Sequence, residues 1–441
     1  MTQNYYIDLL KKINSKNIQI GILGLGYVGL PLAILFGKNN IKTIGFDKSL
    51  KKIKSLENKI NYIPDIDELD FHSVINSDYF LPTNDFSLIS KCDALIICVP
   101  TPLDKFKKPD MSYIQLACEE IGKYMKKGTF ISLESTTYPT TTENLLLPIL
   151  KNVSGYIYDE EFWVCFSPER VDPGNKVYKT ENTPKVIGGL GEKAKEIAKS
   201  LYSICINSVH LVSSPRIAEM VKILENTYRL VNISLINELA LLSGKMDINI
   251  WEVIDAAKTK PFGFQAFYPG PGIGGHCIPL DPFYLEYIAK NYDFDLTMIH
   301  TAGHINNLMA HRMTIKITSA LNSHKKSING SKILFIGVAY KADIDDERES
   351  PALKIIEEVI KKGGLVSYHD PYIDEIQILD LDNNNLLKSI ELNDEYLKSV
   401  DCVVVTTNHK YYDYNIIYEK SNLIVDLRNV IKIKNEKVFK L

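Results

Sequence analysis

The stretch that decides the fold lies near the N-terminus, where residues 17–47 read NIQIGILGLGYVGLPLAILFGKNNIKTIGFD. A β-rich apolar run enters a glycine turn, an apolar helical run follows, and a second β-rich run ends in an acidic residue. This order of periodicities is typical of a βαβ unit with two parallel strands. We therefore expect a doubly wound α/β domain to begin here.

The turn in this unit has the glycine spacing of a dinucleotide-binding loop. Gly24, Gly26 and Gly29 lie between the expected strand and helix, and Asp47 ends the next strand. Glycines there allow a tight turn and a close approach to a pyrophosphate. Asp47 would accept hydrogen bonds from ribose hydroxyls and repel a 2′-phosphate, so NAD is the expected cofactor. A tight turn without a ligand is the alternative, and Lys52 is either a ribose contact or a solvated helix lysine.

Later segments predict the rest of the architecture. Residues 92–100 and 129–136 add strands to the first sheet, which should extend to Val212. Residues 213–246 have apolar residues at helical spacing, with Ser and Pro215 at the start and Gly244 at the end. A helix of this length spans about 45 Å.

A second α/β lobe is expected in the C-terminal part. KILFIGVAY, LVSYHDP and DCVVVTTNH repeat the order of apolar segments in the first lobe. The predicted fold class is therefore α/β, with two Rossmann-like doubly wound parallel-sheet lobes joined by a long central helix and a helical middle region. The expected divisions are a polar leader (1–17), an NAD-binding domain (18–212), a central helical domain (213–323) and a second Rossmann-like domain (324–441).

Composition excludes several classes of protein. A hydrophobic fraction of 45% and a charged fraction of 24% are ordinary for a folded chain, and a net charge of -3 offers no general field for nucleic acid. The seven cysteines form no CxxC pair and show no zinc-like spacing with histidine, so no metal site is expected. We find no signal peptide or membrane-spanning run, so the expected location is cytoplasmic, with no membrane partner.

A second glycine-rich element, GPGIGGHCIPLDP at residues 270–282, follows no expected strand. Asp281 and Pro282 are typical of an N-cap and first turn, which places Cys277 just outside a helix N-terminus, where the pKa of a thiol is lowered. The neighbouring glycines would let the backbone close around a ligand. We therefore interpret Cys277 as a nucleophile, with a buried structural thiol as the alternative.

Polar residues on the long helix and after two strands are further candidates. Lys222 and Asn226 share a helix face and suit the stabilisation of an oxyanion, although such pairs are more often solvated. The segments LESTT (133–137) and FSPER (166–170) follow strands, at the edge where doubly wound sheets bind ligands. Capping residues and ordinary surface are the alternative interpretation for both segments.

Together these features resemble the UDP-glucose/GDP-mannose dehydrogenase family across nearly the whole chain after the leader. The resemblance rests on GLGYVG (24–29), VPTP (99–102), EST (134–136), SPE (167–169), KxxxN (222–226), GGHCIPLD (274–281) and YKADIDDERESP (340–351). Residues 267–285 are most similar to the branch that acts on UDP-N-acetylhexosamines, with UDP-N-acetylglucosamine as the expected substrate. That branch serves bacterial surface-polysaccharide synthesis.

The resemblance also implies roles for individual residues. It makes Cys277 the nucleophile, Lys222 and Asn226 the oxyanion-stabilising pair, and Asp281, Thr136 and Glu169 the residues that order water. The implied NAD contacts are Gly24, Gly26, Tyr27, Val28, Gly29, Asp47, Lys52, Val99, Pro100, Thr101, Ser135, Thr136 and Arg348. The implied UDP-sugar contacts are Glu169, Arg170, Lys222, Asn226, Tyr268, Gly270, Gly272, Gly274, Lys341 and Arg428. A homodimer or higher homo-oligomer built on the long helix is expected as well.

Two segments depart from the pattern of the UDP-glucose branch. Pro261, in TKPFG at residues 259–263, takes the place of an arginine that reaches the neighbouring subunit in that branch. Lys260 could substitute, or the sugar pocket could differ to fit an N-acetyl group. The residues RVDP (170–173) after SPE also differ from that branch, which leaves the contacts of this loop open.

The reaction implied by the resemblance is a four-electron oxidation of C6 through a thiohemiacetal and a thioester on Cys277. UDP-N-acetylgalactosamine, UDP-N-acetylmannosamine and UDP-glucose remain alternative substrates. A two-electron hydroxyacid dehydrogenase is the rival enzyme, but it would need neither Cys277 nor a second lobe. An NAD-binding protein without activity is weaker still, because every expected polar position is filled.

Overall fold

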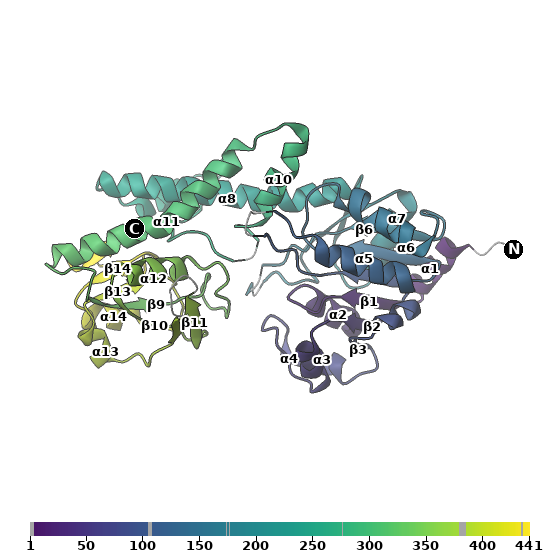
Figure 1. The fold of residues 1–441 in the computed structure, drawn as a ribbon, viewed down its shortest axis with the longest axis horizontal. Coiled ribbons are helices and arrows are strands. Elements are labelled where there is room, and N and C mark those ends of the chain that lie inside the picture. The colour runs from purple at the N-terminus through teal and green to yellow at the C-terminus, as the bar shows by residue number, and fades with distance from the viewer. Residues whose placement is uncertain are drawn as a thin grey trace. The chain divides into compact units, whose positions relative to one another are not determined.

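The computed structural model describes residues 4–104, 108–172, 174–175, 177–275, 277–378, 385–433 and 435–441. The chain forms two compact units (Figure 1). The first unit contains residues up to Glu225 together with Phe283–Asp293. The second contains Asn226–Pro282 and Phe294–Leu441. No helix of the described residues is both long enough and apolar enough to cross a bilayer.

An eight-stranded sheet in the order β3-β2-β1-β4-β5-β6-β7-β8 forms the centre of the first unit. Every neighbouring pair is parallel except β6 and β7, so the predicted parallel sheet is confirmed with one antiparallel pair. Its strands are β1 (Gln19–Leu23), β2 (Lys42–Phe46), β3 (Phe80–Thr83), β4 (Ala94–Ile97), β5 (Thr129–Leu133), β6 (Phe162–Phe166), β7 (Lys185–Gly189) and β8 (Val209–Val212).

Helices cover both faces of this sheet, because its central strands are apolar on both sides. Ile20 and Ile22 of β1 face one core, which includes residues of α1, α2, α4 and α7. Leu23 faces the other core, with α5 and α6. The elements are α1 (Tyr5–Asn14), α2 (Gly29–Lys38), α3 (Leu50–Glu57), α4 (Glu68–Ile75), η1 (Phe86–Lys91), α5 (Ser112–Tyr124), the π-helical turn η2 (Thr142–Leu146), α6 (Leu147–Ser154), α7 (Glu192–Tyr202), α10 (Asp281–Ala289) and η3 (Lys290–Tyr292).

Helix α1 is an element that the sequence analysis did not assign. It lies within the stretch described there as a polar leader. Asn4 caps its start by accepting from the N–H of Ile7, and Leu9 and Ile13 are buried in the first core. Together with the partly buried Tyr5, Tyr6 and Leu10, which pack against the same core, they fix this segment to the domain.

The second unit has a smaller, fully parallel sheet in the order β10-β9-β13-β14-β15 and a separate β11-β12 hairpin. The predicted echo of the first lobe is confirmed, since β10-β9-β13-β14 repeats the arrangement β2-β1-β4-β5. The elements are β9 (Lys332–Ile336), β10 (Leu365–His369), β11 (Glu375–Ile378), β12 (Asn385–Lys388), β13 (Cys402–Val405), β14 (Ile424–Asp426), β15 (Val438–Lys440), α12 (Pro351–Lys361), α13 (Asp394–Ser399) and α14 (Tyr414–Lys420).

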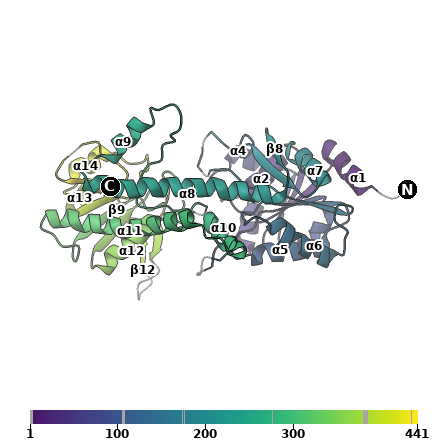
Figure 2. The same ribbon diagram turned by 90° about the horizontal axis from the view of Figure 1, so that it is seen from above.

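The predicted long helix is α8 (Pro215–Lys245), and α9 (Ile250–Ala257) and α11 (Thr297–Ser323) complete the helical region. Within the second unit, α8 and α11 lie side by side (Figure 2). Side-chain amides connect them, since Asn237 Nδ2 donates to Asn306 Oδ1 at 2.9 Å. Asn237 Oδ1 in turn accepts from the N–H of Gly270, which ties the glycine-rich segment to α8.

Candidate functional site

The strand-to-helix turn after β1 has the shape of a phosphate cradle. Gly24 has a φ of +95°, and a Cβ there would lie 2.5 Å from the carbonyl oxygen of Cys98. A Cβ on Gly29 would lie 1.9 Å from the oxygen of Gly24, whereas a Cβ on Gly26 would meet no atom within 4 Å. Val28 provides no side-chain cap for α2. The backbone is therefore tightly packed at Gly24 and Gly29, while the space beside Gly26 is open. The first N–H groups of α2 have no capping side chain, so they are able to bind an anion.

A pocket of about 300 Å³ adjoins this turn. It is lined by Leu23, Gly24, Gly26, Phe46, Asp47, Lys48, Ser49, Lys52, Phe86, Cys98, Val99, Pro100, Tyr113, Leu116, Ala117 and Glu120. Asp47 Oδ2 accepts from the N–H of Leu25 and from Lys52 Nζ, both at 2.9 Å. Lys52 is therefore an ion-pair partner of Asp47 at the pocket wall, with a side chain that stays partly exposed. The residues present fit the adenosine half of NAD.

The segments after β4 and β5 lie at the adjoining strand ends. Ser135 Oγ donates to the carbonyl oxygen of Val99 at 2.8 Å, and the carbonyl oxygen of Thr101 accepts from the hydroxyl of Tyr284. Thr136 is half-buried, and its hydroxyl has no hydrogen-bond partner among the described residues. That hydroxyl is placed to bind a ligand or water.

The segment after β6 is held closely by its own side chains and by α8. Glu169 Oε1 accepts from the N–H groups of Arg170 and Val171, both at 2.7 Å. Lys222 Nζ donates to the carbonyl oxygen of Glu169 at 2.5 Å. Arg170 forms a two-point ion pair with Glu225 and also donates to the carbonyl oxygen of Pro184. The guanidinium of Arg170, which was predicted to contact the substrate, is therefore already bound to other groups of the protein.

A buried ion pair beneath these segments was missed by the sequence analysis. Lys185 Nζ lies 3.0 Å from Glu134 Oε2, and both residues are almost completely buried. Tyr202 donates its hydroxyl to Glu134 Oε1 at 2.5 Å. Glu134 belongs to the recognised EST motif, but no spacing in the sequence connects it to Lys185. A buried charge needs such a partner, because desolvation of an isolated carboxylate is costly.

The glycine-rich segment of the second unit carries Cys277, the one partly exposed cysteine of the seven. A Cβ on Gly274 or Gly275 would lie 2.7 Å from atoms of Tyr340, and the N–H of Gly275 donates to the carbonyl oxygen of Arg348 at 2.9 Å. Gly272 has a φ of +135° beside Pro351. These glycines therefore let the loop pack closely against residues 340–351.

The structure has Asp281 as the first residue of α10, whereas the sequence predicted it as the N-cap before a helix that begins at Pro282. Its N–H donates to the carbonyl oxygen of Cys277 at 2.8 Å, so a hydrogen-bonded turn links the two residues. Asn226 Nδ2 donates to Asp281 Oδ2 at 2.5 Å, and Asn226 Oδ1 accepts from Arg229. An amide and a carboxylate from the candidate set therefore meet within the second unit.

Other candidates are distributed over the same unit. Arg348 pairs with Asp346 through its guanidinium, and Lys341 is half-buried beside Tyr340. Tyr268 stacks on Trp251 at 5.7 Å between ring centroids and accepts from Lys258. Two residues of the recognised motifs, His276 and Pro173, lie outside the described residues.

Arg428 is a cation without an acidic partner among the described residues. Its Nε donates to the carbonyl oxygen of Thr406 at 2.7 Å. Its Nη1 lies 2.7 Å from the position that a Cβ on Gly270 would take, so a larger residue at position 270 would displace the guanidinium. Burial lowers the pKa of Arg428 to about 10, which still leaves it charged at neutral pH. This arrangement suits a phosphate or diphosphate.

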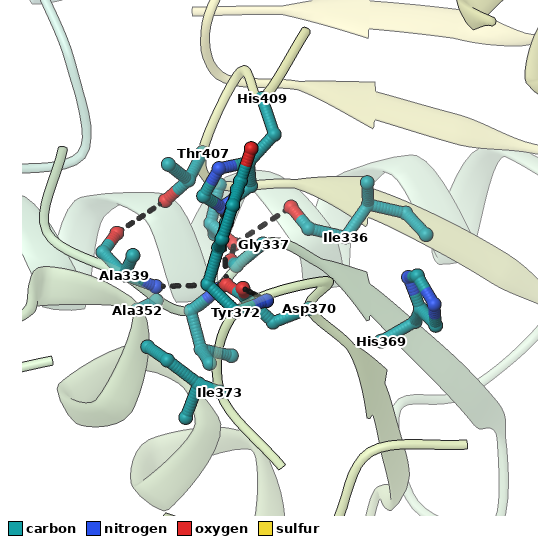
Figure 3. A network of polar contacts seen from close by, with 12 residues as sticks. Ile336, Gly337, Ala339, Ala352, His369, Asp370, Tyr372, Ile373, Thr407 and His409 are labelled. Atoms are coloured by element: carbon teal, nitrogen blue, oxygen red, sulfur yellow. Dashed lines mark hydrogen bonds and ion pairs between the residues drawn. The ribbon is translucent and has the colours of Figure 1, made fainter. Parts of the chain in front are cut away.

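The turn after β9 repeats the first glycine turn but is filled by side chains (Figure 3). Gly337 has a φ of +80°, and Asp370 Oδ2 accepts from the N–H groups of Val338 and Ala339. His409 Nε2 lies 3.1 Å from the same oxygen, and neither side chain is exposed. His409 Nδ1 accepts from the N–H of Asp343, so Nε2 carries the proton that is donated to Asp370.

Comparison with known proteins identifies a family over most of the chain. Three models of the UDP-glucose/GDP-mannose dehydrogenase family match the chain: the NAD-binding domain at residues 18–206, the central domain at 216–308 and the UDP-binding domain at 334–433. Protein CapL of Staphylococcus aureus is 35% identical over 94% of this chain and 96% of its own. UDP-N-acetyl-D-glucosamine 6-dehydrogenase of Pseudomonas aeruginosa is 34% identical over 81% of this chain and 84% of its own.

A solved structure is similar over almost the full length. UDP-D-ManNAc dehydrogenase from Pyrococcus horikoshii superposes with a TM-score of 0.87 at 31% identity, covering 96% of this chain and 99% of that one. With three family models matched in order, the chain belongs to the UDP-glucose/GDP-mannose dehydrogenase family of NAD-dependent enzymes.

Proposed function

We propose that this enzyme oxidises the C6 hydroxymethyl group of a UDP-N-acetylhexosamine to a carboxylate, with UDP-N-acetylglucosamine as the preferred substrate. The exposure of Cys277 is the observation that carries the proposal. The other six cysteines are buried, and burial raises the pKa of Cys92, Cys165 and Cys205 to about 12. Only Cys277 combines access with a glycine-rich loop, as a nucleophile requires.

Four of the candidate polar residues would serve the first oxidation and the capture of its product. Thr136 and Glu169 order a water that takes the proton of the C6 hydroxyl. Lys222 and Asn226 stabilise the oxyanion that forms at C6. When bound, NAD⁺ supplies the hydride acceptor, and one molecule of NAD⁺ is needed for each of the two hydrides that leave C6.

Cys277 makes the second oxidation possible. Its thiolate adds to the aldehyde carbon and keeps the reactive aldehyde in the site as a thiohemiacetal. Loss of the second hydride leaves a thioester, and a water ordered by Asp281 hydrolyses it to the carboxylate and the thiol. Four electrons leave C6 in two steps, and one water supplies the second carboxylate oxygen.

The UDP half of the substrate would lie on the second unit. Arg428, which has no acidic partner among the described residues, supports diphosphate binding beside Gly270. Lys341, Tyr268, Gly272 and Gly274 would complete the contacts. Arg170 is proposed to act on the substrate only through the loop that it fixes, because its guanidinium is already paired with Glu225.

The choice among hexosamines rests on similarity. The relatives include enzymes named for UDP-N-acetylglucosamine and for UDP-N-acetylmannosamine. Both names favour an N-acetyl group over a hydroxyl at C2. Phe262, 72% exposed beside Lys260, stands in the loop where the UDP-glucose branch has its arginine. A pocket built to bind an acetamido group would disfavour UDP-glucose by about 1–3 kcal/mol, or roughly ten- to a hundred-fold in kcat/KM.

A homodimer through α8 is also proposed. Exposed apolar residues follow one face of this helix: Ile217, Met220, Leu224, Tyr228, Leu235, Leu239 and Leu242. Their spacing of three, four or seven residues makes a continuous stripe, opposite the face of Lys222 and Asn226. A second copy fits best, since identical stripes are self-complementary about a two-fold axis. Leu224→Glu should convert a dimer to a monomer in light scattering, whereas Leu69→Glu, at an exposed site on α4, should not.

A cytoplasmic location stays a prediction, as does a role in surface-polysaccharide synthesis.

The test is turnover of four UDP-sugars at saturating NAD⁺: the N-acetylglucosamine, N-acetylmannosamine, N-acetylgalactosamine and glucose derivatives. We expect two NADH per sugar and a uronic acid identified by mass, with UDP-N-acetylglucosamine giving the highest kcat/KM. One NADH per sugar would favour a two-electron dehydrogenase, and UDP-glucose equalling the hexosamines would exclude the substrate assignment. Cys277→Ser should stop multiple turnover while Cys165→Ser, at a buried thiol, should not.

A further inference from the structure

Helix α8 buries a carboxylate, Glu219, that no step of the proposed reaction uses. The residue is 0% exposed. Its Oε2 accepts from the N–H of Thr140 at 2.6 Å. Its Oε1 accepts from the N–H of Thr142 at 2.9 Å and from the Thr142 hydroxyl at 2.7 Å. Both carboxylate oxygens therefore accept hydrogen bonds from residues 140–142, a segment that is distant in sequence.

That segment carries Thr136. It runs from the end of β5 to the start of η2, and it is fixed at its beginning by the bond from Ser135 Oγ to Val99. At its end, Thr140 has a φ of +84°, a left-handed conformation that is unfavourable for a β-branched residue. Such a conformation persists only when the surroundings hold it, and Glu219 binds the N–H of that very residue.

The same face of α8 also contacts the segment that carries Glu169. Lys222 lies one turn after Glu219, and its Nζ donates to the carbonyl oxygen of Glu169 at 2.5 Å. Two adjacent side chains of one helix therefore hold the two strand-end segments that are proposed to order water. Their relative position is set by the spacing of Glu219 and Lys222.

A simpler alternative is that Glu219 only stabilises the fold as a cap for η2. Its burial argues for more than that, because desolvation raises the pKa of Glu219 to about 7 in spite of the hydrogen bonds from Thr140 and Thr142. No cation pairs with Glu219 among the described residues, and its two oxygens are matched only by the three donors of Thr140 and Thr142. A buried, unpaired carboxylate is a costly way to cap a turn. A glutamine would place N–H groups against one of these N–H donors.

We propose that Glu219 is a positioning residue, which holds the Thr140 end of the segment so that Thr136 lies at a fixed distance from Lys222 and Glu169. The catalytic part of this inference rests on the proposed function. Loss of the contact would let the Thr136 hydroxyl move while the NAD pocket stays intact.

The first test is steady-state kinetics of Glu219→Gln. We expect kcat to fall by about 10-fold or more, since a small displacement of a reacting group is enough for such a loss, with the KM for NAD⁺ within about 2-fold of wild type. Glu143→Gln is the matched control, because Glu143 joins η2 to Arg216 of α8 without holding a backbone N–H. Unchanged kcat in Glu219→Gln, or an equal loss in the control, would overturn the proposal.

A second variant separates positioning from folding. Glycine adopts the left-handed conformation without strain, so Thr140→Gly should restore part of the kcat lost in Glu219→Gln. Thr136→Ala should also lose kcat, and combining it with Glu219→Gln should cost no more than Thr136→Ala alone. Additive losses would mean that Glu219 acts independently of Thr136.

Amide hydrogen exchange without substrate keeps the inference distinct from the proposed function. In Glu219→Gln, the peptide covering residues 134–142 should exchange faster, while residues 166–172 should not. If the wild type oxidised no UDP-sugar, the proposed function would fail, and the exchange result would still decide whether Glu219 holds this segment. Unchanged exchange at Thr140 and Thr142 would overturn the positioning role.

Discussion

The two glycine turns of the molecule begin alike and end differently. In each unit a glycine with positive φ follows the first strand, and a Cβ there would lie 2.5 Å from the Cys98 oxygen or 2.6 Å from the Thr407 oxygen. An acidic residue ends the neighbouring strand in both, Asp47 or Asp370. Asp47 borders a pocket of about 300 Å³, whereas Asp370 is sealed by His409. The side chain that follows the central strand, and not the turn, decides whether a nucleotide can enter.

The helix after each turn differs as well. In the first unit, α2 begins at Gly29 directly after the turn, and Val28 provides no side-chain cap. In the second, α12 begins only at Pro351, and Ser350 caps it by accepting from the N–H of Ala352. The N–H groups that would bind a pyrophosphate are therefore near the first turn only. We conclude that a shared topology accommodates one dinucleotide site.

The largest expected effect comes from replacing the two turn glycines. Both Gly24→Ala and Gly337→Ala should lower stability, because each places a Cβ against backbone in a left-handed conformation. Only Gly24→Ala should affect NAD, since the loss of two charge-assisted hydrogen bonds of about 1.5–3 kcal/mol each weakens binding by about 100-fold or more. Calorimetric titration and melting curves of both variants check this. An equal loss of NAD affinity in Gly24→Ala and Gly337→Ala would show that the two turns do not differ in NAD binding.

Replacing the two acidic residues should give a smaller difference. Asp47→Ala removes hydrogen bonds to the ribose, so the KM for NAD⁺ should rise by about 10-fold, and discrimination against NADP⁺ should relax. Asp370→Asn should leave the KM for NAD⁺ unchanged. Initial rates with both cofactors measure the effect. A preference for NAD⁺ that survives in Asp47→Ala would show that another group selects the cofactor.

The buried carboxylate of the second turn should also make the stability of the protein depend on pH. Burial raises the pKa of Asp370, but the hydrogen bond from His409 and those from the backbone N–H groups of Tyr372 and Val338 outweigh burial and hold the pKa below its usual value. A lowered folded-state pKa contributes stability above about pH 4, and this contribution is lost as the pH falls below that value. Asp370→Asn should flatten this dependence in urea unfolding between pH 3 and 7. A slope as steep as that of wild type would mean that other carboxylates cause it.

The smallest effect is expected at Lys52. Its ion pair with Asp47 is partly exposed, with 37% of the lysine side chain accessible, so the pair contributes about 1 kcal/mol or less. Lys52→Gln should therefore raise the KM for NAD⁺ by about 5-fold at most. High salt should reduce the difference between wild type and variant. A loss as large as that of Asp47→Ala would assign Lys52 a direct contact to the cofactor.

Local patterns predicted much of this molecule. Residues 17–47 predicted β1, the turn and α2, the helical spacing after Ser213 predicted α8, and the repeated apolar segments predicted the second sheet. Helix α1 was missed although its apolar residues have helical spacing, because the lack of a continuous apolar run led us to interpret residues 1–17 as a polar leader.

The missed side-chain contacts have a different cause. Glu219 meets Thr140, Arg170 meets Glu225, and His409 meets Asp370 only when the chain has folded. The pairs are far apart in sequence, and no periodicity connects their members. The spacing of Glu219, Lys222 and Asn226 on one helix face was a usable signal for the first of them. Whether a glycine turn was open or filled could not be predicted from the turn itself.

Hydrogen exchange with and without NAD⁺ reports on both glycine turns in one measurement, so it shows directly whether only the first turn binds the dinucleotide. We predict slower exchange at residues 24–30 and 47–52 when NAD⁺ is bound, and no change at residues 337–339 and 370–372. Slower exchange at the second turn, or none at the first, would contradict the claim that only the first unit has an open dinucleotide site.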